Sequence, residues 1–260
     1  MISYLTKALK NKLIIFNRKY GYLIHEKIVK LFFGEIDDIE LFNIDERIIE
    51  KLKLKIKKMK KLKFSNYHNQ KKFKNFKILS KKTWIYNKRD QFVYDQFDST
   101  QEWFDIDDDK FFKDFTKSLF PIFKKYLKSY FSVVNIRVWN NLPNGKIVIG
   151  RNKKERGSYR NHKDGFPPGH VKVMIYLNKL DKDHGYFIYE DKEVKSKIPG
   201  LGIAFKNSDL FHRAVVGKTN NRYVIEYTLL RTLTNVNSLK YYYPSTPDTM
   251  YLTGPIQAYF

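Results

Sequence analysis

The fold is decided by residues 201–231, which read LGIAFKNSDLFHRAVVGKTNNRYVIEYTLLR. β-Branched and aromatic residues gather here into short runs, and residues that favour turns stand between the runs. This alternation predicts three successive β-strands, at 201–205, 210–216 and 222–231.

Two of these predicted strands carry polar side chains that a chemical site could use. His212 lies inside the apolar run of the second strand, and Arg222 begins the third strand ten residues later. The turn residues of segment 217–221 predict a hairpin, which would place Arg222 beside the strand of His212. A histidine alone in such a run is more often a hydrogen-bonded core residue than a ligand, so its partners must decide its role.

The same alternation begins after residue 130 and predicts a mainly β C-terminal half. Many short strands at this spacing favour a sandwich or small barrel of the jelly-roll class. The further predicted strands are 131–139, 146–150, 170–177 and 185–190.

The first 130 residues are predicted to be mainly helical. Segments 3–32 and 109–130 read as helices, and Pro121 is expected to kink or split the second. Apolar residues three or four apart predict another helix over 44–63, with Asn43 as its N-cap.

The predicted architecture is α+β and mainly β. A helical N-terminal region, residues 1–130, packs on a double-stranded β-helix formed by residues 131–260, and the two make up one structural domain. Every candidate apolar stretch is interrupted by lysine, so we expect no transmembrane segment or signal peptide and a soluble, intracellular, cytoplasmic protein.

The chain carries a formal net charge of +23, and the charge is unevenly placed. Residues 51–82 hold fourteen lysines and no acid, whereas residues 90–109 hold eight acids and no lysine or arginine. The abundance of Lys, Asn, Ile, Tyr and Phe is typical of an AT-rich coding sequence, which explains the charge without any function. The alternative is a nucleic-acid or polyanion-binding element at residues 44–82, with the barrel as a non-catalytic scaffold. The two blocks could also pair with each other across the fold.

Upstream of the strands, residues 161–165 read NHKDG and contain the pair His162 and Asp164. In a strand, residues i and i+2 point to the same face, so these two side chains could bind one ion from inside a barrel. The pair is a weak motif by itself. The chain has no cysteine, so a metal ion would have to be held by histidine and carboxylate ligands.

Together with His212, the pair makes two histidines and one carboxylate. That donor set leaves three positions of an ion open, as in the facial triad of non-haem Fe(II) oxygenases. A 2-oxo acid can take two positions and dioxygen the third. The far carboxylate of the cosubstrate then needs a fixed cation, and arginine suits it because it stays charged and binds in a bidentate way.

Residues 160–231 resemble the 2-oxoglutarate and Fe(II)-dependent dioxygenase superfamily, which includes prolyl hydroxylase-like and phytanoyl-CoA hydroxylase-like enzymes. The family pattern is His-x-Asp, a distal His, and an Arg or Lys about ten residues later. This chain matches the pattern in the same order, with NHKDG, then VKVMIYLNKLDKDHGYFIYED, then residues 199–230. The resemblance implies that His162, Asp164 and His212 bind iron. It further implies that Arg222 binds 2-oxoglutarate and that Tyr176 contacts it, with Arg137 and Arg160 as alternatives for a second contact.

The resemblance implies a hydroxylase that consumes 2-oxoglutarate and dioxygen, releases succinate and CO2, and acts on an unidentified small molecule or side chain. Two departures leave the subfamily open: Ala214 stands where many phytanoyl-CoA hydroxylase-like members have a hydroxyl residue, and residues 189–191 replace a turn common in them. The pair Asp181 and Asp183 is read as a turn rather than as a glycosyltransferase metal site.

Overall fold

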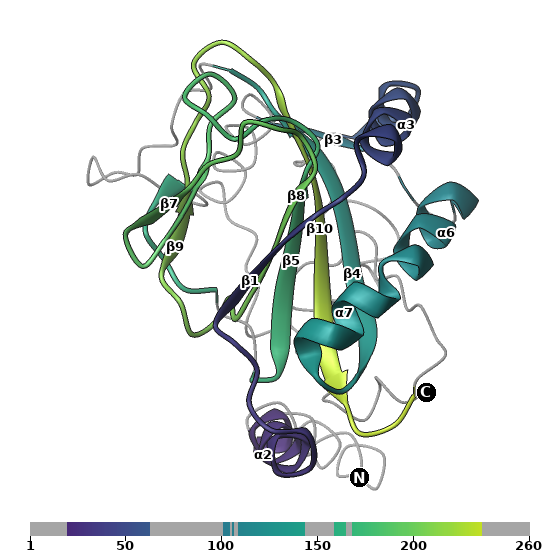
Figure 1. Ribbon diagram of the computed structural model, residues 1–260, viewed down its shortest axis with the longest axis vertical. Helices are drawn as coiled ribbons and strands as arrows, with labels where there is room; N and C mark the ends of the chain where they lie inside the picture. The colour runs from purple at the N-terminus through teal and green to yellow at the C-terminus, as the bar shows by residue number, and fades with distance from the viewer. Residues whose placement is uncertain are drawn as a thin grey trace, which may run out of the picture.

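The structure of the protein is a computed structural model (Figure 1). It describes residues 20–62, 101–104, 106, 109–143, 159–164 and 168–235. The predicted strand at 146–150 and most of the lysine-rich block, from residue 63 onward, lie outside the described residues, as do residues 3–19 of the first predicted helix.

Most of the described chain belongs to a large antiparallel sheet in the order β1-β8-β5-β10-β4-β3-β2. The long strand β10 lies in its middle, paired with β4 on one side and with β5 on the other. The strands are β1 (Ile39–Asn43), β2 (Lys61–Leu62), β3 (Gln101–Phe104), β4 (Tyr130–Asn141), β5 (His170–Tyr176), β8 (Leu201–Phe205) and β10 (Arg222–Thr232).

A small antiparallel sheet completes the β structure, in the order β7 (Lys192–Val194), β6 (Phe187–Tyr189) and β9 (His212–Ala214). An isolated bridge between His162 and His212 adds one more segment beside β9. The predicted strands of the C-terminal half that lie within the described residues are therefore confirmed, and the fold is β-rich.

The predicted hairpin between β9 and β10 is wrong, because the two strands belong to different sheets. The backbone of residues 218–220 hydrogen-bonds instead to the carbonyls of Lys182 and Asp183. Gly217 also packs so tightly on this turn that an added Cβ would lie 2.5 Å from the Asp183 carbonyl oxygen. The connection is thus a crossover from the small sheet to the large one.

The two sheets enclose an apolar core. The outer face of the large sheet is covered by α3 (Glu46–Lys57), α6 (Lys110–Ser118) and α7 (Phe120–Leu127), whereas α2 (Tyr22–Phe33) lies at the end of that sheet (Figure 1). Side chains alternate along β10: Val224 packs in the core between the sheets, whereas Ile225 and Tyr227 pack in the core under the helices. Any polar side chain on the inner face of β10 is therefore held inside the protein.

The described helices are α2 (Tyr22–Phe33), α3 (Glu46–Lys57), α6 (Lys110–Ser118) and α7 (Phe120–Leu127). Pro121 lies in the first turn of α7, so the predicted split of the 109–130 helix is confirmed. The predicted N-cap of α3 is wrong. Asn43 ends β1, and the side chain of Asp45 caps the helix by accepting a hydrogen bond from the Arg47 backbone N–H at 2.8 Å.

The lysine-rich and acid-rich blocks meet where both are described. Lys55 Nζ lies 2.7 Å from Asp109 Oδ2, and Lys61 contacts Glu102. The predicted pairing of the blocks is confirmed at these two positions. The polyanion-binding alternative stays a prediction, as does the division of the chain at residue 130. None of the described helices is long and apolar enough to cross a membrane.

Candidate metal centre

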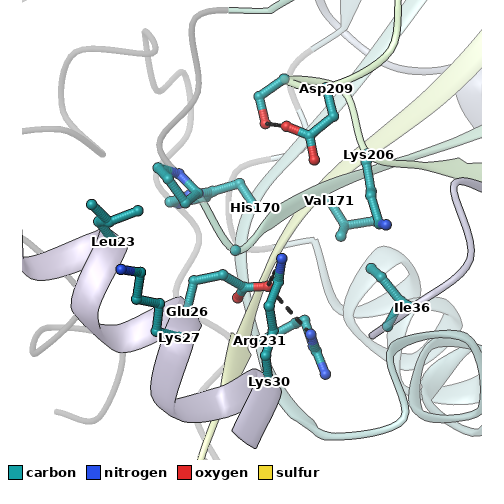
Figure 2. Close-up of a pocket in the computed structure, with 13 residues that line it drawn as sticks. Leu23, Glu26, Lys27, Lys30, Ile36, His170, Val171, Lys206, Asp209 and Arg231 are labelled. Carbon is teal, nitrogen blue, oxygen red and sulfur yellow. Dashed lines mark hydrogen bonds and ion pairs between the residues drawn. The ribbon is translucent and has the colours of Figure 1, made fainter. Parts of the chain in front are cut away.

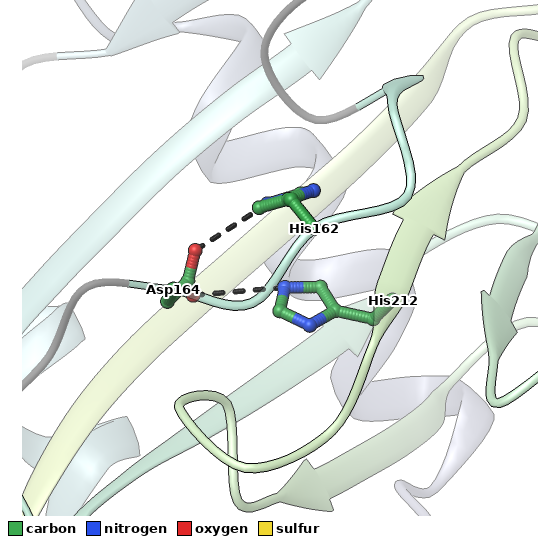
Figure 3. A group of neighbouring side chains, drawn as sticks. All are labelled: His162, Asp164 and His212. Atoms are coloured by element: carbon green, nitrogen blue, oxygen red, sulfur yellow. Dashed lines mark ion pairs between the residues drawn. The ribbon is translucent and has the colours of Figure 1, made fainter.

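Three side chains that the sequence singled out lie together between the sheets: His162, Asp164 and His212 (Figure 3). One ligand atom from each lies within 4.8 Å of the other two. His162 Nε2 is 3.4 Å from Asp164 Oδ1, and His212 Nε2 is 3.6 Å from Asp164 Oδ2. A single cation could therefore contact all three side chains.

Backbone pairing brings the two histidines side by side. The His162 N–H donates to the His212 carbonyl at 3.1 Å, and the His212 N–H donates back at 2.9 Å. The expectation that His162 and Asp164 both lie in a strand is wrong. His162 forms only this single bridge, while Asp164 follows it outside any strand, with its N–H bound to the Asn207 carbonyl at 2.9 Å.

Hydrogen bonds fix the orientation of both imidazole rings. His162 Nδ1 lies 2.6 Å from the Arg160 carbonyl oxygen, and His212 Nδ1 lies 3.0 Å from that of Leu210. Because a carbonyl oxygen can only accept, Nδ1 carries the proton in each ring, and the neutral ring has its lone pair on Nε2. Both lone pairs thus face the Asp164 carboxylate, an arrangement that a bound cation would stabilise.

The carboxylate of Asp164 is held by two donors that the sequence analysis did not identify. Lys172 Nζ contacts Asp164 Oδ2, and Asn207 Nδ2 donates to the same oxygen at 3.1 Å. Burial by itself raises the pKa of Asp164, but the nearby Lys172 ammonium is the strongest opposing influence, and that pKa lies far below its usual range. Asp164 is therefore ionised and available as a ligand.

Lys172 also lies 3.4 Å from Glu226 Oε2, and Glu226 in turn lies 3.5 Å from Arg137 Nη1. The side chains of Lys172 and Glu226 are only 11% and 6% exposed. The sequence contains a pattern from which both residues could have been predicted to lie in the site. Lys172 interrupts the apolar strand HVKVMIY, and Glu226 interrupts RYVIEYTLLRT. A charge in a strand that is otherwise buried must be paired inside the protein.

Arg222 opens β10 and is 2% exposed. Its Nη1 donates to the carbonyls of Tyr186 and Val215 at 3.2 and 3.1 Å, and its guanidinium lies 5.7 Å from the centre of the Tyr176 ring. Burial lowers its pKa. Among the described residues, no carboxylate forms an ion pair with it. Arg222 and the two histidines line one pocket, together with Gln101, Trp139, Asn141, Lys172, Met174, Phe187, Ala214 and Glu226.

The other predicted contacts take different places. Tyr176 is 1% exposed beside Arg222, and burial raises the pKa of its phenol. Arg137 is occupied by Glu226, and the Arg160 carbonyl accepts from His162. Asp181 accepts hydrogen bonds from the backbone N–H groups of Asp183 and His184, which confirms the turn.

A second cavity, of about 220 Å³, lies between α2 and the end of the large sheet (Figure 2). Arg231 is fully buried at its wall and pairs with Glu26 at 3.3 Å. Arg231 Nη2 donates to the Gly34 carbonyl at 2.8 Å. The residues of the His-Asp-His cluster are not among those that line this cavity, so we regard the Arg231 pair as structural.

No protein-family model and no curated protein matches the chain. Several solved structures are similar in fold. A viral collagen prolyl hydroxylase from Paramecium bursaria Chlorella virus-1, in complex with 2-oxoglutarate, is 13% identical; the match covers 76% of this chain and 97% of that one, with a TM-score of 0.42.

Two further neighbours cover similar shares. HygX from Streptomyces hygroscopicus, with nickel and 2-oxoglutarate bound, is 10% identical over 79% of this chain and 87% of its own, with a TM-score of 0.45. SnoN, a non-haem α-ketoglutarate-dependent epimerase from nogalamycin biosynthesis, is 8% identical over 82% and 84%, with a TM-score of 0.48. At these identities and TM-scores, a functional assignment has to rest on the side chains of the site.

Proposed function

We propose that this protein is a 2-oxoglutarate- and Fe(II)-dependent oxygenase with a double-stranded β-helix fold. The observation that carries the proposal is a single pocket that joins the His-Asp-His cluster to a buried arginine for which the described residues supply no carboxylate. The His-Asp-His cluster is suited to a metal ion, and the buried arginine is suited to an anionic cosubstrate.

The strand order supports the proposed fold. After β5 the chain passes to the small sheet, returns to the large sheet at β8, enters the small sheet at β9 and returns at β10. Such repeated crossing between two facing sheets is how a jelly roll closes around its interior. Ligands borne by segments of both sheets can then meet inside.

The donor set fits Fe(II). His162, Asp164 and His212 would hold the ion through two imidazole nitrogens and a carboxylate, which leaves open positions on it. Bound iron supplies the activation of dioxygen, coupled to oxidative decarboxylation of 2-oxoglutarate to succinate and CO2. The chain itself keeps both Nε2 atoms free of protons through the Arg160 and Leu210 carbonyls.

Arg222 is the proposed partner of the far carboxylate of 2-oxoglutarate. Its hydrogen bonds to the Tyr186 and Val215 carbonyls fix the plane of the guanidinium without neutralising it. A planar cation held in this way favours a bidentate carboxylate. Tyr176 flanks the cation and would orient the same end of the cosubstrate.

The remaining walls of the pocket favour a shielded reaction. Trp139, Met174 and Phe187 line it with apolar surface, which keeps water away from the reacting groups. The oxidised substrate is proposed to be a small molecule or a side chain that becomes hydroxylated, with dioxygen as the second partner.

The test is to purify the protein without oxygen, add Fe(II) and 2-oxoglutarate, and record the visible charge-transfer band. Succinate is then measured when air is admitted. We expect both signals in the wild-type protein and neither in Asp164→Ala or His212→Ala. His184→Ala is the matched control, because His184 is bound to Asp181 in a turn outside the pocket. Succinate formation by Asp164→Ala at the wild-type rate would refute the assignment.

A further inference from the structure

Lys172 lies between two buried carboxylates, and only one of them belongs to the proposed metal site. Its Nζ contacts Asp164 Oδ2 and lies 3.4 Å from Glu226 Oε2. Lys172 projects from β5 and Glu226 from the adjacent β10, each from the face that lines the pocket. The Lys172 ammonium thus pairs with both carboxylates, those of Asp164 and Glu226.

Glu226 is well placed to interfere with the metal site. It lies four residues after Arg222 on the same face of β10 and lines the pocket together with His162 and His212. Its Oε1 is buried and accepts no hydrogen bond, and its ion pair with Arg137 is 3.5 Å long. A carboxylate this weakly held is a ready ligand for a divalent cation.

We propose that Lys172 is a positioning residue that keeps Glu226 off the metal, so that the site has three protein ligands instead of four. The inference rests on the proposed function. A fourth protein ligand, the second carboxylate, would take one of the three positions that 2-oxoglutarate and dioxygen require. Lys172 prevents this by pairing with Glu226 while Asp164 stays anchored by Asn207, through both its side chain and its backbone carbonyl.

Stability alone is a poor explanation for this arrangement. Burying three charged groups costs desolvation, and a buried ion pair can often be replaced by apolar residues without loss of stability. The arrangement therefore favours a role in the site. It predicts that removing Lys172 leaves Glu226 with Arg137 alone, 3.5 Å away, and lets the carboxylate turn toward the metal, whereas removing Lys172 and the carboxylate together does not.

The experiment uses Co(II) as the probe, because its visible spectrum reports the number and geometry of its ligands. Co(II) affinity and spectrum are measured for the wild-type protein, Lys172→Met, Glu226→Gln and the double variant. We expect Lys172→Met to bind Co(II) about tenfold more tightly than the double variant, because both have lost the repelling cation and only Lys172→Met gains a carboxylate. We also expect 2-oxoglutarate to lose its effect on the Lys172→Met spectrum. Glu226→Gln and the double variant should keep the wild-type spectrum.

Equal Co(II) affinity or identical spectra for Lys172→Met and the double variant would overturn the inference. If Lys172→Met does not fold, Glu226→Gln decides alone: a changed spectrum or lower affinity means that Glu226 is already a ligand. Wild-type protein whose Co(II) binding is absent, or is unaffected by His212→Ala, would instead refute the proposed function.

Discussion

Replacing Arg222 with methionine should selectively weaken the use of 2-oxoglutarate. The guanidinium is 2% exposed, and in the described part of the chain its hydrogen bonds run to carbonyl oxygens rather than to a carboxylate. Its charge is therefore available to a ligand. Removing one partner of a buried, hydrogen-bonded charge pair costs about 2–5 kcal/mol. That corresponds to roughly a 30- to 4,000-fold loss of affinity.

The assay is succinate formation as a function of 2-oxoglutarate concentration, with and without the substitution. Because Arg222 would bind the end of the cosubstrate that does not react, KM should rise by this factor, whereas kcat at saturation should change little. Arg222→Lys keeps a charge without the planar fork and should fall between the two. Melting of the metal-free proteins shows whether each variant is folded.

A 2-oxo acid without the far carboxylate, such as 2-oxobutanoate, provides the control. The wild-type protein should prefer 2-oxoglutarate strongly, and Arg222→Met should lose most of that preference. The reasoning is refuted if a folded Arg222→Met protein keeps the wild-type KM for 2-oxoglutarate. It is equally refuted if the preference between the two acids is unchanged.

Three further predictions concern stability. Arg231→Met leaves the buried Glu26 carboxylate with only Lys30, 4.0 Å away, so urea unfolding should show a loss of about 3 kcal/mol. Burial raises the pKa of Asp109, but the hydrogen bond with Lys55 and the capping bonds at α6 outweigh burial, so the pKa is lowered in the folded protein. The ionised Asp109 therefore stabilises the fold above the unfolded-state pKa of about 3.9, and this stabilisation is lost as the pH falls through the lower folded-state pKa. The difference in melting temperature between the wild type and Asp109→Asn should therefore be largest near neutral pH and shrink in acid. Gly202→Ala would place a Cβ 2.2 Å from the Phe42 ring and should cost about 1–3 kcal/mol by thermal melting.

The sequence predicted the strands of the C-terminal half well because their signal is local. Alternating β-branched and aromatic residues between turn residues mark β5, β8 and β10 without knowledge of their partners. The pairing of strands is not local, and the hairpin between β9 and β10 was predicted wrongly for that reason. A short, turn-rich connection is compatible with a hairpin and with a crossover, and here the contacts with Asp183 select the crossover.

The strands before residue 130 were all missed, and for β2 and β3 the reason is related. β2 is a two-residue strand at the end of a lysine-rich helix, and β3 carries Gln101 and Glu102. Neither has enough apolar residues to show the alternation of a strand. They become strands because the edge of β4 offers β3 a partner and β3 then offers one to β2. Such edge pairing depends on tertiary contacts.

The three candidate metal ligands lie together, as their spacing suggested, but the backbone structure that brings them together is not the predicted one. His162 and Asp164 were expected to share a face of one strand, and the structure gives them a single bridge followed by an irregular segment. Their convergence comes from separate backbone contacts, with His212 for the first and with Asn207 for the second. A His-x-Asp motif therefore predicts proximity of the side chains better than it predicts the backbone.

The site lies where the two sheets meet. The side chains that contact its three candidate ligands therefore come from several segments and could not be predicted from the sequence of any one of them. The histidines are fixed at the edge of the small sheet by the bridge that joins them. Asp164 is tied to Lys172 of the large sheet and to Asn207 in the connection between β8 and β9. A change in the spacing of the sheets would therefore move the carboxylate relative to the imidazoles. The charged residues between the sheets set the geometry of the site as well as its charge. The sequence of one strand contains only one of the two partners in each of these contacts.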